Sequence, residues 1–196
     1  RVPASVITNV ADDVRALRAA VDGPIIFKAM STPTLAAEAV EGAERVSRGI
    51  GTTIVDDAML DSLDAVSELS CQFQEYIAKQ YELRITVIGK RLFAARLYSQ
   101  DDARTAVDSR DMSASIRYEA CTLPDDIRQR CLDFVHSYGL EYGALDLIVT
   151  PDGEYVFLEN NPVGQFLYVQ QLVPALPLLE SVADTLIEGA LCHSRT

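Results

Sequence analysis

Residues 142–165 contain two apolar strands joined by a turn at 151–153, and their polar side chains stand at fixed places. Asp146 lies on the first strand, and Glu159 and Asn161 lie near the end of the second. Folding the hairpin brings them to the same end, and the two-residue period of a strand puts Glu159 and Asn161 on one face. Three oxygen donors on an otherwise apolar sheet are costly unless a cation neutralises them. Oxygen-only donors predict Mg²⁺ or Mn²⁺ rather than Zn²⁺.

These three residues have two interpretations. The functional one is a paired Mg²⁺ site that bridges nucleotide phosphates, because two cations neutralise the charge that develops during phosphoryl transfer. The other is a set of solvent-exposed strand residues without a ligand, which the apolar character of both strands disfavours.

The composition predicts a folded, acidic chain. Its 196 residues, 48% of them hydrophobic, suffice for one or two domains with a sizeable core. The net charge of −12 disfavours DNA or RNA as a partner, because phosphate binding needs a basic surface. No apolar run reaches the ~20 residues of a membrane span and no signal-peptide pattern opens the sequence, so a cytoplasmic location is expected. Four cysteines without CxxC spacing predict free thiols, and two histidines offer little material for a histidine metal site or a catalytic triad.

Hydrophobic periodicity predicts an α+β fold in which an antiparallel sheet is covered by helices. Helices are expected at residues 10–20, 34–47, 61–69, 124–138 and, as an amphipathic closing helix, 172–191. Strands are expected at 25–29, 71–77, 82–88, 92–98 and in the hairpin at 142–161. A polar loop is expected over 99–115.

Charged side chains on the other strands are further candidate ligands. Glu82 and Arg84 share one strand face, where a carboxylate suits ribose hydroxyls and a guanidinium suits phosphate or a substrate carboxylate. The alternative for this pair is a solvated surface ion pair. Lys28, within an apolar strand, either reaches the surface or points at an anion, and Arg96 presents the same choice. The end of strand 71–77 frees backbone groups that can bind an adenine edge, as any strand end can.

Taken in order, these residues resemble those of the ATP-grasp ligases. The matching positions are Lys28, Gln74-Glu75-Tyr76-Ile77, Glu82-Leu83-Arg84, Asp146 and Glu159-Asn160-Asn161. Other segments resemble the ATP-grasp peptide maturases, which include the microviridin-type ligases that make graspetides. These segments are Phe93–Gln100, Asp108-Ser109-Arg110, Tyr142–Asp146 and Leu158–Gln165.

The resemblance implies an ATP-grasp fold that holds the nucleotide between two subdomains, residues 1–77 and 78–196. The backbone at the end of strand 71–77 would bind adenine, Lys28 the α- and β-phosphates, and Glu82 the ribose. Nucleotide-binding positions are thus implied at Lys28, Gln74, Glu75, Tyr76, Ile77 and Glu82. Metal-binding positions, for two Mg²⁺ with Mn²⁺ as an alternative, are implied at Asp146, Glu159 and Asn161. Catalytic positions that contact the γ-phosphate and an acyl phosphate are implied at Arg84, Arg96 and Arg110.

The implied reaction activates an Asp or Glu side chain of a ribosomally made precursor peptide as an acyl phosphate. A Thr or Ser hydroxyl or a Lys amine then forms an ω-ester or ω-amide crosslink. The alternatives are a ligase that adds an amino acid to a protein or small molecule, and a non-catalytic peptide-binding remnant. The expected partners are a precursor peptide, with a leader docked near residues 99–118 and an acidic and hydroxyl-bearing core, and a second copy of the chain in a homodimer.

The sequence departs from the family pattern at three places. The additional N-terminal domain that family members carry before a segment like Arg1-Val2-Pro3 is expected to be missing, by truncation or by natural loss. The segment 31–35 lacks the glycines of a phosphate-binding loop; Gly49 and Gly51 are candidates for such a loop, with a plain linker as the alternative. Ser109 stands where an aromatic residue is usual.

Overall fold

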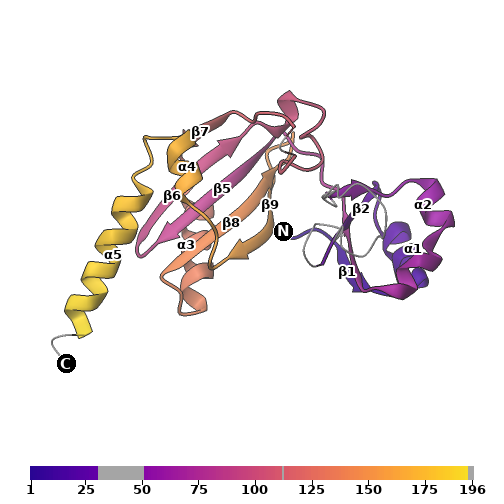
Figure 1. The fold of residues 1–196 in the computed structure, drawn as a ribbon, viewed down its shortest axis with the longest axis horizontal. Coiled ribbons are helices and arrows are strands. Elements are labelled where there is room, and N and C mark those ends of the chain that lie inside the picture. The colour runs from indigo at the N-terminus through magenta and orange to yellow at the C-terminus, as the bar shows by residue number, and fades with distance from the viewer. Residues whose placement is uncertain (31–50, 112, 194–196) are drawn as a thin grey trace, which may run out of the picture. The chain divides into compact units, whose positions relative to one another are not determined.

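A computed structural model describes residues 1–30, 51–111 and 113–193, which separate into two compact units (Figure 1). The small unit comprises Pro3–Ile77 and Asp102–Ser115, and the large unit comprises Arg1–Val2, Ala78–Asp101 and Ile116–Thr196. The helix expected at 34–47, the segment 31–35 and Gly49 lie outside the described residues.

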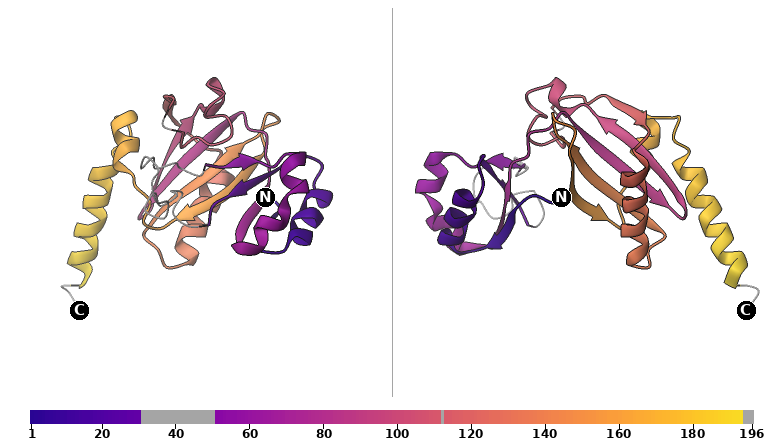
Figure 2. Two further views of the ribbon diagram at one scale, coloured as in Figure 1. Left: turned by 45° about the vertical axis from the view of Figure 1, so that its right-hand side comes forward. Right: turned by 180° about the vertical axis from the view of Figure 1, so that it is seen from behind.

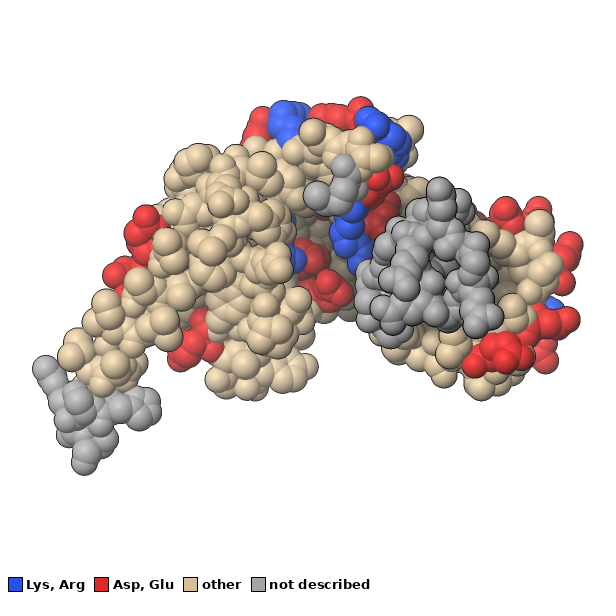
Figure 3. All heavy atoms as spheres, viewed as in Figure 1, with Lys and Arg blue, Asp and Glu red and all other residues tan. Residues whose placement is uncertain are grey.

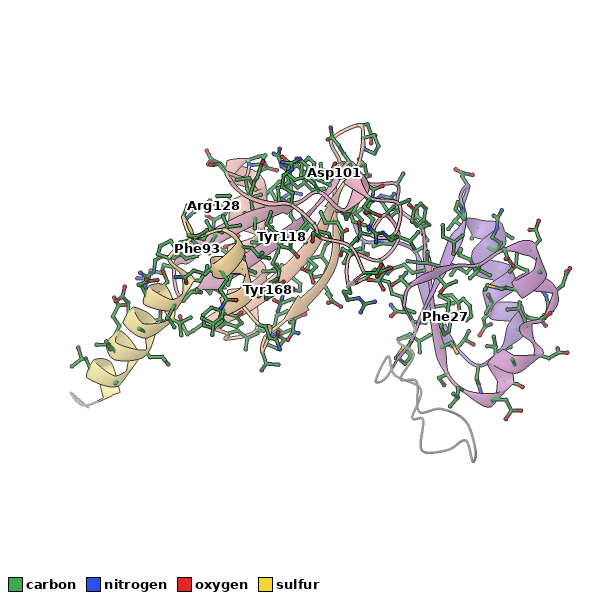
Figure 4. The ribbon with its side chains drawn as sticks, turned by 45° about the horizontal axis from the view of Figure 1, so that its top comes forward. Phe27, Phe93, Asp101, Tyr118, Arg128 and Tyr168 are labelled. Atoms are coloured by element: carbon green, nitrogen blue, oxygen red, sulfur yellow. The ribbon has the colours of Figure 1, made fainter. Side chains whose placement is uncertain are left out.

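The small unit is an antiparallel sheet with helices packed on one face. Its strand order is β1-β4-β2-β3. The strands are β1 (Ser5–Thr8), β2 (Ile25–Lys28), β3 (Thr53–Ile54) and β4 (Cys71–Glu75). The helices are α1 (Ala11–Ala20), α2 (Asp57–Asp61) and the 3₁₀ helix η2 (Leu63–Glu68). Val14 of α1 is buried in one core with Phe73, whose ring meets that of Phe27 edge to face with centroids 5.8 Å apart (Figure 4). Among the charged side chains visible on this unit, acidic ones predominate over basic ones (Figure 3).

The large unit is a five-stranded antiparallel sheet with helices against both faces. Its strand order is β7-β6-β5-β8-β9. The strands are β5 (Tyr81–Ile88), β6 (Arg91–Leu97), β7 (Tyr118–Cys121), β8 (Tyr142–Val149) and β9 (Tyr155–Asn161). The helices are the 3₁₀ helix η3 (Ser99–Asp101), α3 (Asp125–Ser137), α4 (Leu167–Leu172) and α5 (Leu178–His193). Two acidic residues in the first turn of α3 favour its start, and Gly139, with φ +68°, follows its end.

Side chains of the large sheet alternate between two faces, as the sequence predicts for strand 82–88. Leu83, Ile85 and Val87 are buried in a core shared with α3, which lies along this face of the sheet (Figure 2). Glu82 and Arg84 point to the opposite face, where α4 and α5 close a second core. The strand period therefore separates a packed face from a face that carries charge.

The α+β fold class with antiparallel sheets is confirmed, but some elements differ from the prediction. The expected closing helix 172–191 is α5, but it begins only at Leu178, because Pro174 and Pro177 lack the N–H groups that a longer helix needs. The expected helix 61–69 is mostly the 3₁₀ helix η2, preceded by α2. The edge strand β7 lies next to the loop where the sequence predicted no element.

Two expectations from composition can be examined in the described ranges. Cys71, Cys121 and Cys131 are free thiols, as predicted. Within residues 1–30, 51–111 and 113–193, every helix is too short or too polar to traverse a lipid bilayer.

Candidate functional site

The three expected metal ligands lie on the paired strands β8 and β9, with Asp146 in the middle of β8 and with Glu159 and Asn161 in the last three residues of β9. Asp146 and Glu159 are Cα partners across the two strands, and Asn161 is the partner of Ala144. The register shifts beside Asp146, so that Leu158 is an extra residue in β9. The period of two beyond this bulge keeps Asn161 on the same face as Glu159. Hairpin folding therefore brings the acidic side chains together, as the sequence predicts.

Arg84 holds the Asp146 carboxylate from the neighbouring strand. The two residues are Cα partners between β5 and β8, and Arg84 Nη1 donates to Asp146 Oδ1 at 2.9 Å and to Oδ2 at 2.8 Å. The Arg84 side chain is only 11% exposed, and that of Asp146 is 32% exposed. Burial is the main cause that raises the pKa of Asp146 to about 6; Arg84 opposes this shift, and the nearby charge of Glu159 adds to it. A second cation at this position would relieve that charge.

A glycine loop after β9 covers Arg84. Arg84 Nη2 donates to the Gln165 carbonyl at 3.3 Å, and the Tyr142 hydroxyl donates to the Gly164 carbonyl. A Cβ on Gly164 would lie 2.6 Å from the Ala144 Cβ and 3.2 Å from Arg84 Nη2, so only glycine allows this approach. Tyr142 and Gly164 are site residues that sequence patterns alone do not predict, although both lie in the segments that carry the resemblance.

Aromatic residues border the same face. The Tyr118 and Tyr168 rings meet at right angles with centroids 6.3 Å apart, and Figure 4 shows both over the sheet. Burial raises the pKa of both hydroxyls, so they stay neutral hydrogen-bonding groups at physiological pH.

Glu82 lies on the same sheet face as Arg84, and two partners not predicted from the sequence hold it. Lys79 Nζ donates to Glu82 Oε1 at 2.8 Å, and Ser99 Oγ donates to the same oxygen at 2.5 Å. The Lys79 side chain is 4% exposed and that of Glu82 is 14% exposed, so this is a buried ion pair. The spacing of three residues between Lys79 and Glu82 was the available signal.

The remaining nucleotide-binding candidates lie in the small unit. Lys28 Nζ donates to Gln74 Oε1 at 2.8 Å. At the end of β4, the Glu75 N–H donates to the Ala4 carbonyl and the Tyr76 N–H to the Pro24 carbonyl. Among the residues that the structure describes, the Ile77 N–H has no hydrogen-bond partner. Of these three N–H groups, that of Ile77 is therefore the one available to bind a ligand.

Arg96 does not share the sheet face of Arg84, and Arg110 belongs to the other unit. Arg96 is the Cα partner of Leu83, so it lies on the face of the sheet opposite Arg84. Its guanidinium carbon lies 4.2 Å from the centre of the Tyr81 ring. Arg110 belongs to the small unit, where it pairs with Asp108 at 2.8 Å and its side chain is 69% exposed.

The donor set of the hairpin fits a magnesium ion in its chemistry. No group of three His, Cys, Asp or Glu side chains within the described ranges is arranged to hold a metal, so the Asn161 carboxamide is needed beside Asp146 and Glu159. Asn161 Oδ1 accepts from the Val163 N–H at 3.0 Å, and Asp146 accepts from Arg84. The carboxamide oxygen of Asn161 and the carboxylate oxygens of Asp146 each have a further lone pair that a hard cation can share.

Comparison with known proteins identifies the fold. No protein-family profile matches the chain, and no curated protein matches it significantly. Macrocyclase MdnC of Microcystis aeruginosa MRC, solved with precursor peptide MdnA, is 29% identical with a TM-score of 0.81, over 96% of this chain and 57% of MdnC. A RiPP-associated ATP-grasp ligase of Chryseobacterium gregarium, solved with ADP and a leader and core peptide, is 28% identical with a TM-score of 0.86, over 96% of this chain and 55% of that one.

A third structure was solved with a metal and a nucleotide. ATP-grasp ligase PsnB, complexed with minimal precursor, Mg and ADP, is 25% identical with a TM-score of 0.69, over 94% of this chain and 53% of PsnB. The chain therefore spans about half the length of these three proteins. The resemblance seen in the sequence is confirmed: this chain has the ATP-grasp fold, and its structural relatives are RiPP-associated ATP-grasp ligases.

Proposed function

We propose that the chain forms the nucleotide- and metal-binding part of an ATP-dependent, ADP-forming ligase that modifies a precursor peptide. The observation that carries this proposal is the Asp146–Glu159 pair with Arg84 held against it on one sheet face. The relatives support it, since their structures contain precursor peptides, ADP and Mg.

The proposed reaction has two steps. A carboxylate oxygen of a peptide Asp or Glu bonds to the γ-phosphorus of ATP while the bond to ADP breaks. A Thr or Ser hydroxyl or a Lys amine then attacks the acyl carbon, loses its proton and releases phosphate. The product is an ω-ester or ω-amide crosslink. No protein nucleophile is needed, so catalysis rests on positioning and on charge stabilisation.

Five candidate residues of the large unit have a role in this scheme: Glu82, Arg84, Asp146, Glu159 and Asn161. Asp146, Glu159 and Asn161 hold Mg²⁺, with Mn²⁺ as an alternative and two ions as the proposed number, and the metal charge counters that of the phosphates. Arg84 stabilises charge on the transferred phosphoryl group. Glu82, held by Lys79 and Ser99, accepts hydrogen bonds from the ribose hydroxyls.

The small unit supplies the other nucleotide contacts. Lys28 binds the α- and β-phosphates as a point charge, and the free Ile77 N–H binds the adenine edge. Arg110, exposed beside Asp108, is proposed to meet the substrate carboxylate or its acyl phosphate. The catalytic role of Arg96 stays a prediction, and its place on the opposite sheet face does not favour it.

The proposal includes two partners. The leader of the precursor peptide is placed near residues 99–118, so deleting this loop is expected to abolish peptide binding. A homodimer is the second partner, because α5 exposes Leu186, Ile187 and Leu191. Sedimentation of the chain as a monomer at micromolar concentration would contradict the homodimer.

Calorimetry with ADP and Mg²⁺ tests the binding half of the proposal. The chain is expected to bind MgADP, and Asp146→Asn and Glu159→Gln are each expected to weaken binding at least tenfold, or about 1.4 kcal/mol. Glu188→Gln, an exposed carboxylate on α5, is the matched control and should leave affinity unchanged. Undetectable binding by the unaltered chain, or equal binding by all variants, contradicts the proposal.

Mass spectrometry tests the reaction in the full-length protein. Incubation with ATP, Mg²⁺ and a peptide is expected to remove one water per crosslink and to form one ADP. A gain of a residue mass would instead show a ligase that appends an amino acid. An unchanged peptide mass without ADP formation would contradict the ligase activity and would favour the alternative of a non-catalytic peptide-binding protein.

A further inference from the structure

Three hydrogen bonds run in series across one face of the small sheet. Lys28 Nζ donates to Gln74 Oε1 at 2.8 Å, and Gln74 Nε2 donates to Ser5 Oγ at 2.9 Å. Ser5 Oγ in turn donates to the Pro3 carbonyl at 3.0 Å. The three side chains thus connect Lys28 to the backbone before β1.

The strand register places these side chains on a common face. Ser5 on β1 and Ile26 on β2 are both Cα partners of Gln74, which lies on the central strand β4. Lys28 follows Ile26 by two residues, so it points to the same face. Gln74 is 5% exposed, and a buried carboxamide needs partners for both of its polar atoms. Lys28 and Ser5 are those partners.

The donor order fixes which way the Gln74 amide points. The Ser5 hydroxyl gives its one proton to the Pro3 carbonyl, so it can only accept from Gln74, and the amide nitrogen must face it. The amide oxygen is then directed at the Lys28 ammonium. The reverse orientation would set an NH₂ group against an NH₃⁺ group and leave no acceptor there.

A neutral partner has a specific consequence for Lys28. A carboxylate at position 74 would hold the ammonium and also cancel its charge, so it would compete with an incoming phosphate. The carboxamide holds the ammonium through a hydrogen bond and adds no negative charge that would compete with an anion.

We propose that the Gln74 side chain is a positioning residue that aims Lys28 at the nucleotide phosphates, and that Ser5 locks the orientation of the Gln74 amide. This inference rests on the proposed function for Lys28. It gives the side chain of Gln74 a phosphate-directed role, distinct from the adenine contact made by the backbone at the end of β4.

Calorimetry with two ligands on the full chain tests this role. Adenosine reports adenine and ribose contacts, and MgADP also reports phosphate contacts. Gln74→Leu is expected to weaken MgADP binding by roughly tenfold, the effect of one charge-assisted hydrogen bond. Gln74→Glu should weaken it at least as much, because the new charge pairs with Lys28. Both variants should bind adenosine as the unaltered chain does, which also shows that they are folded.

Two variants of Ser5 and one control extend this test. Ser5→Ala should lose part of the MgADP affinity and Ser5→Thr should restore it, because only the hydroxyl is required. Gln129→Leu, the same change at an exposed glutamine of α3 that pairs with Asp133, is the control and should change neither affinity.

The possible outcomes separate this inference from the proposed function. If Lys28→Met weakens MgADP binding but Gln74→Leu does not, the positioning role is wrong and the proposed function stands. If Gln74→Leu weakens adenosine and MgADP equally, Gln74 contacts adenine and the positioning role is again wrong. If Lys28→Met binds MgADP normally, the phosphate role of Lys28 fails and this inference fails with it.

Discussion

Asp146 and Glu159 are Cα partners across β8 and β9 because Leu158 forms a bulge between them and the turn of the hairpin. In a regular hairpin continued from the pair Leu147 and Phe157, Asp146 would oppose Leu158. Glu159 would then oppose Leu145, which is buried in the core on the α3 side. One extra residue therefore moves a carboxylate from a packed face to the face of the proposed metal site.

The first prediction concerns the pH dependence of metal binding. The pKa of Asp146 is raised to about 6, so the folded chain takes up a proton there more readily than the unfolded chain. This protonation stabilises the fold at low pH, and the contribution is lost as pH rises through about 6. Mg²⁺ needs the ionised carboxylate, so MgADP affinity should fall as pH is lowered through the same range.

Calorimetry between about pH 5 and pH 8 measures this dependence. Asp146→Asn should bind MgADP weakly and with a flatter pH profile. A profile through pH 6 that is equally steep in this variant would assign the titration to another group.

The second prediction concerns the buried ion pair of Arg84 and Asp146. Arg84→Leu leaves a partly buried carboxylate without its partner, which is expected to cost about 3 kcal/mol in the free energy of unfolding. The double change Arg84→Leu and Asp146→Leu should cost less than the sum of the single changes, because neither charge is left alone.

Urea denaturation without Mg²⁺ measures these free energies. The control is Arg91, which pairs with Asp184 at 2.9 Å and donates to a backbone carbonyl as Arg84 does, but on an exposed surface. Arg91→Leu is expected to cost about 1 kcal/mol at most. Equal costs for Arg84→Leu and Arg91→Leu would show that burial does not strengthen the Arg84 pair.

The sequence predicted what depends on local period and missed what depends on strand pairing. Alternation in strand 82–88 placed Glu82 and Arg84 on one face, because the period of a single strand is enough for this. Arg96 was grouped with Arg84, but β5 and β6 pair so that Arg96 opposes Leu83. Which face of a sheet a residue joins depends on the register with a neighbouring strand, and no single segment specifies that register.

The burial of polar residues against their partners also could not be predicted from local sequence patterns. Lys79 looks like a connector residue in sequence, yet it is buried against Glu82 in the large unit. Residues 102–115 lie between two segments of the large unit and nevertheless pack with the small unit, where Thr52 meets Asp108. Both the burial of Lys79 and the packing of residues 102–115 depend on tertiary contacts, which hydrophobic periodicity does not predict.

The third prediction concerns the close packing of Gly164 over Arg84. Gly164→Ala would place a methyl group 2.6 Å from the Ala144 Cβ, and neither group has a torsion that relieves the clash. The loop must therefore move, at an expected cost of about 1–3 kcal/mol, and the Arg84 contact to the Gln165 carbonyl should weaken with it. Thermal denaturation and MgADP calorimetry measure the two effects.

Gly189 in α5 provides the control for this substitution. An added Cβ there has no atom within 4 Å, so Gly189→Ala should be neutral or stabilise the helix by up to about 1 kcal/mol. If Gly164→Ala leaves both stability and MgADP affinity unchanged, the loop does not need glycine at this position.

The last prediction compares two Asp-x-Arg turns in the same loop. Asp102 accepts from the backbone and side chain of Arg104, and Asp108 does the same with Arg110. Only Asp108 also accepts from the Thr52 N–H, at 2.8 Å, and its side chain is 14% exposed. Burial alone would raise the pKa of Asp108, but these hydrogen bonds bring it well below its usual range. Its stabilising contribution is therefore present above about pH 4 and is lost as pH falls further.

Limited proteolysis of the loop near neutral pH separates the two turns. Asp108→Asn is expected to weaken the attachment to Thr52 and to speed cleavage within residues 102–115, because a carboxamide oxygen accepts these N–H groups less strongly than a carboxylate. Asp102→Asn removes the same local contacts without touching Thr52, so cleavage should remain slower than in Asp108→Asn. Faster cleavage of Asp108→Asn than of Asp102→Asn is expected only if the contact with Thr52, and not the turn itself, holds the loop in place. Equal cleavage rates for the two variants would contradict this role of Thr52.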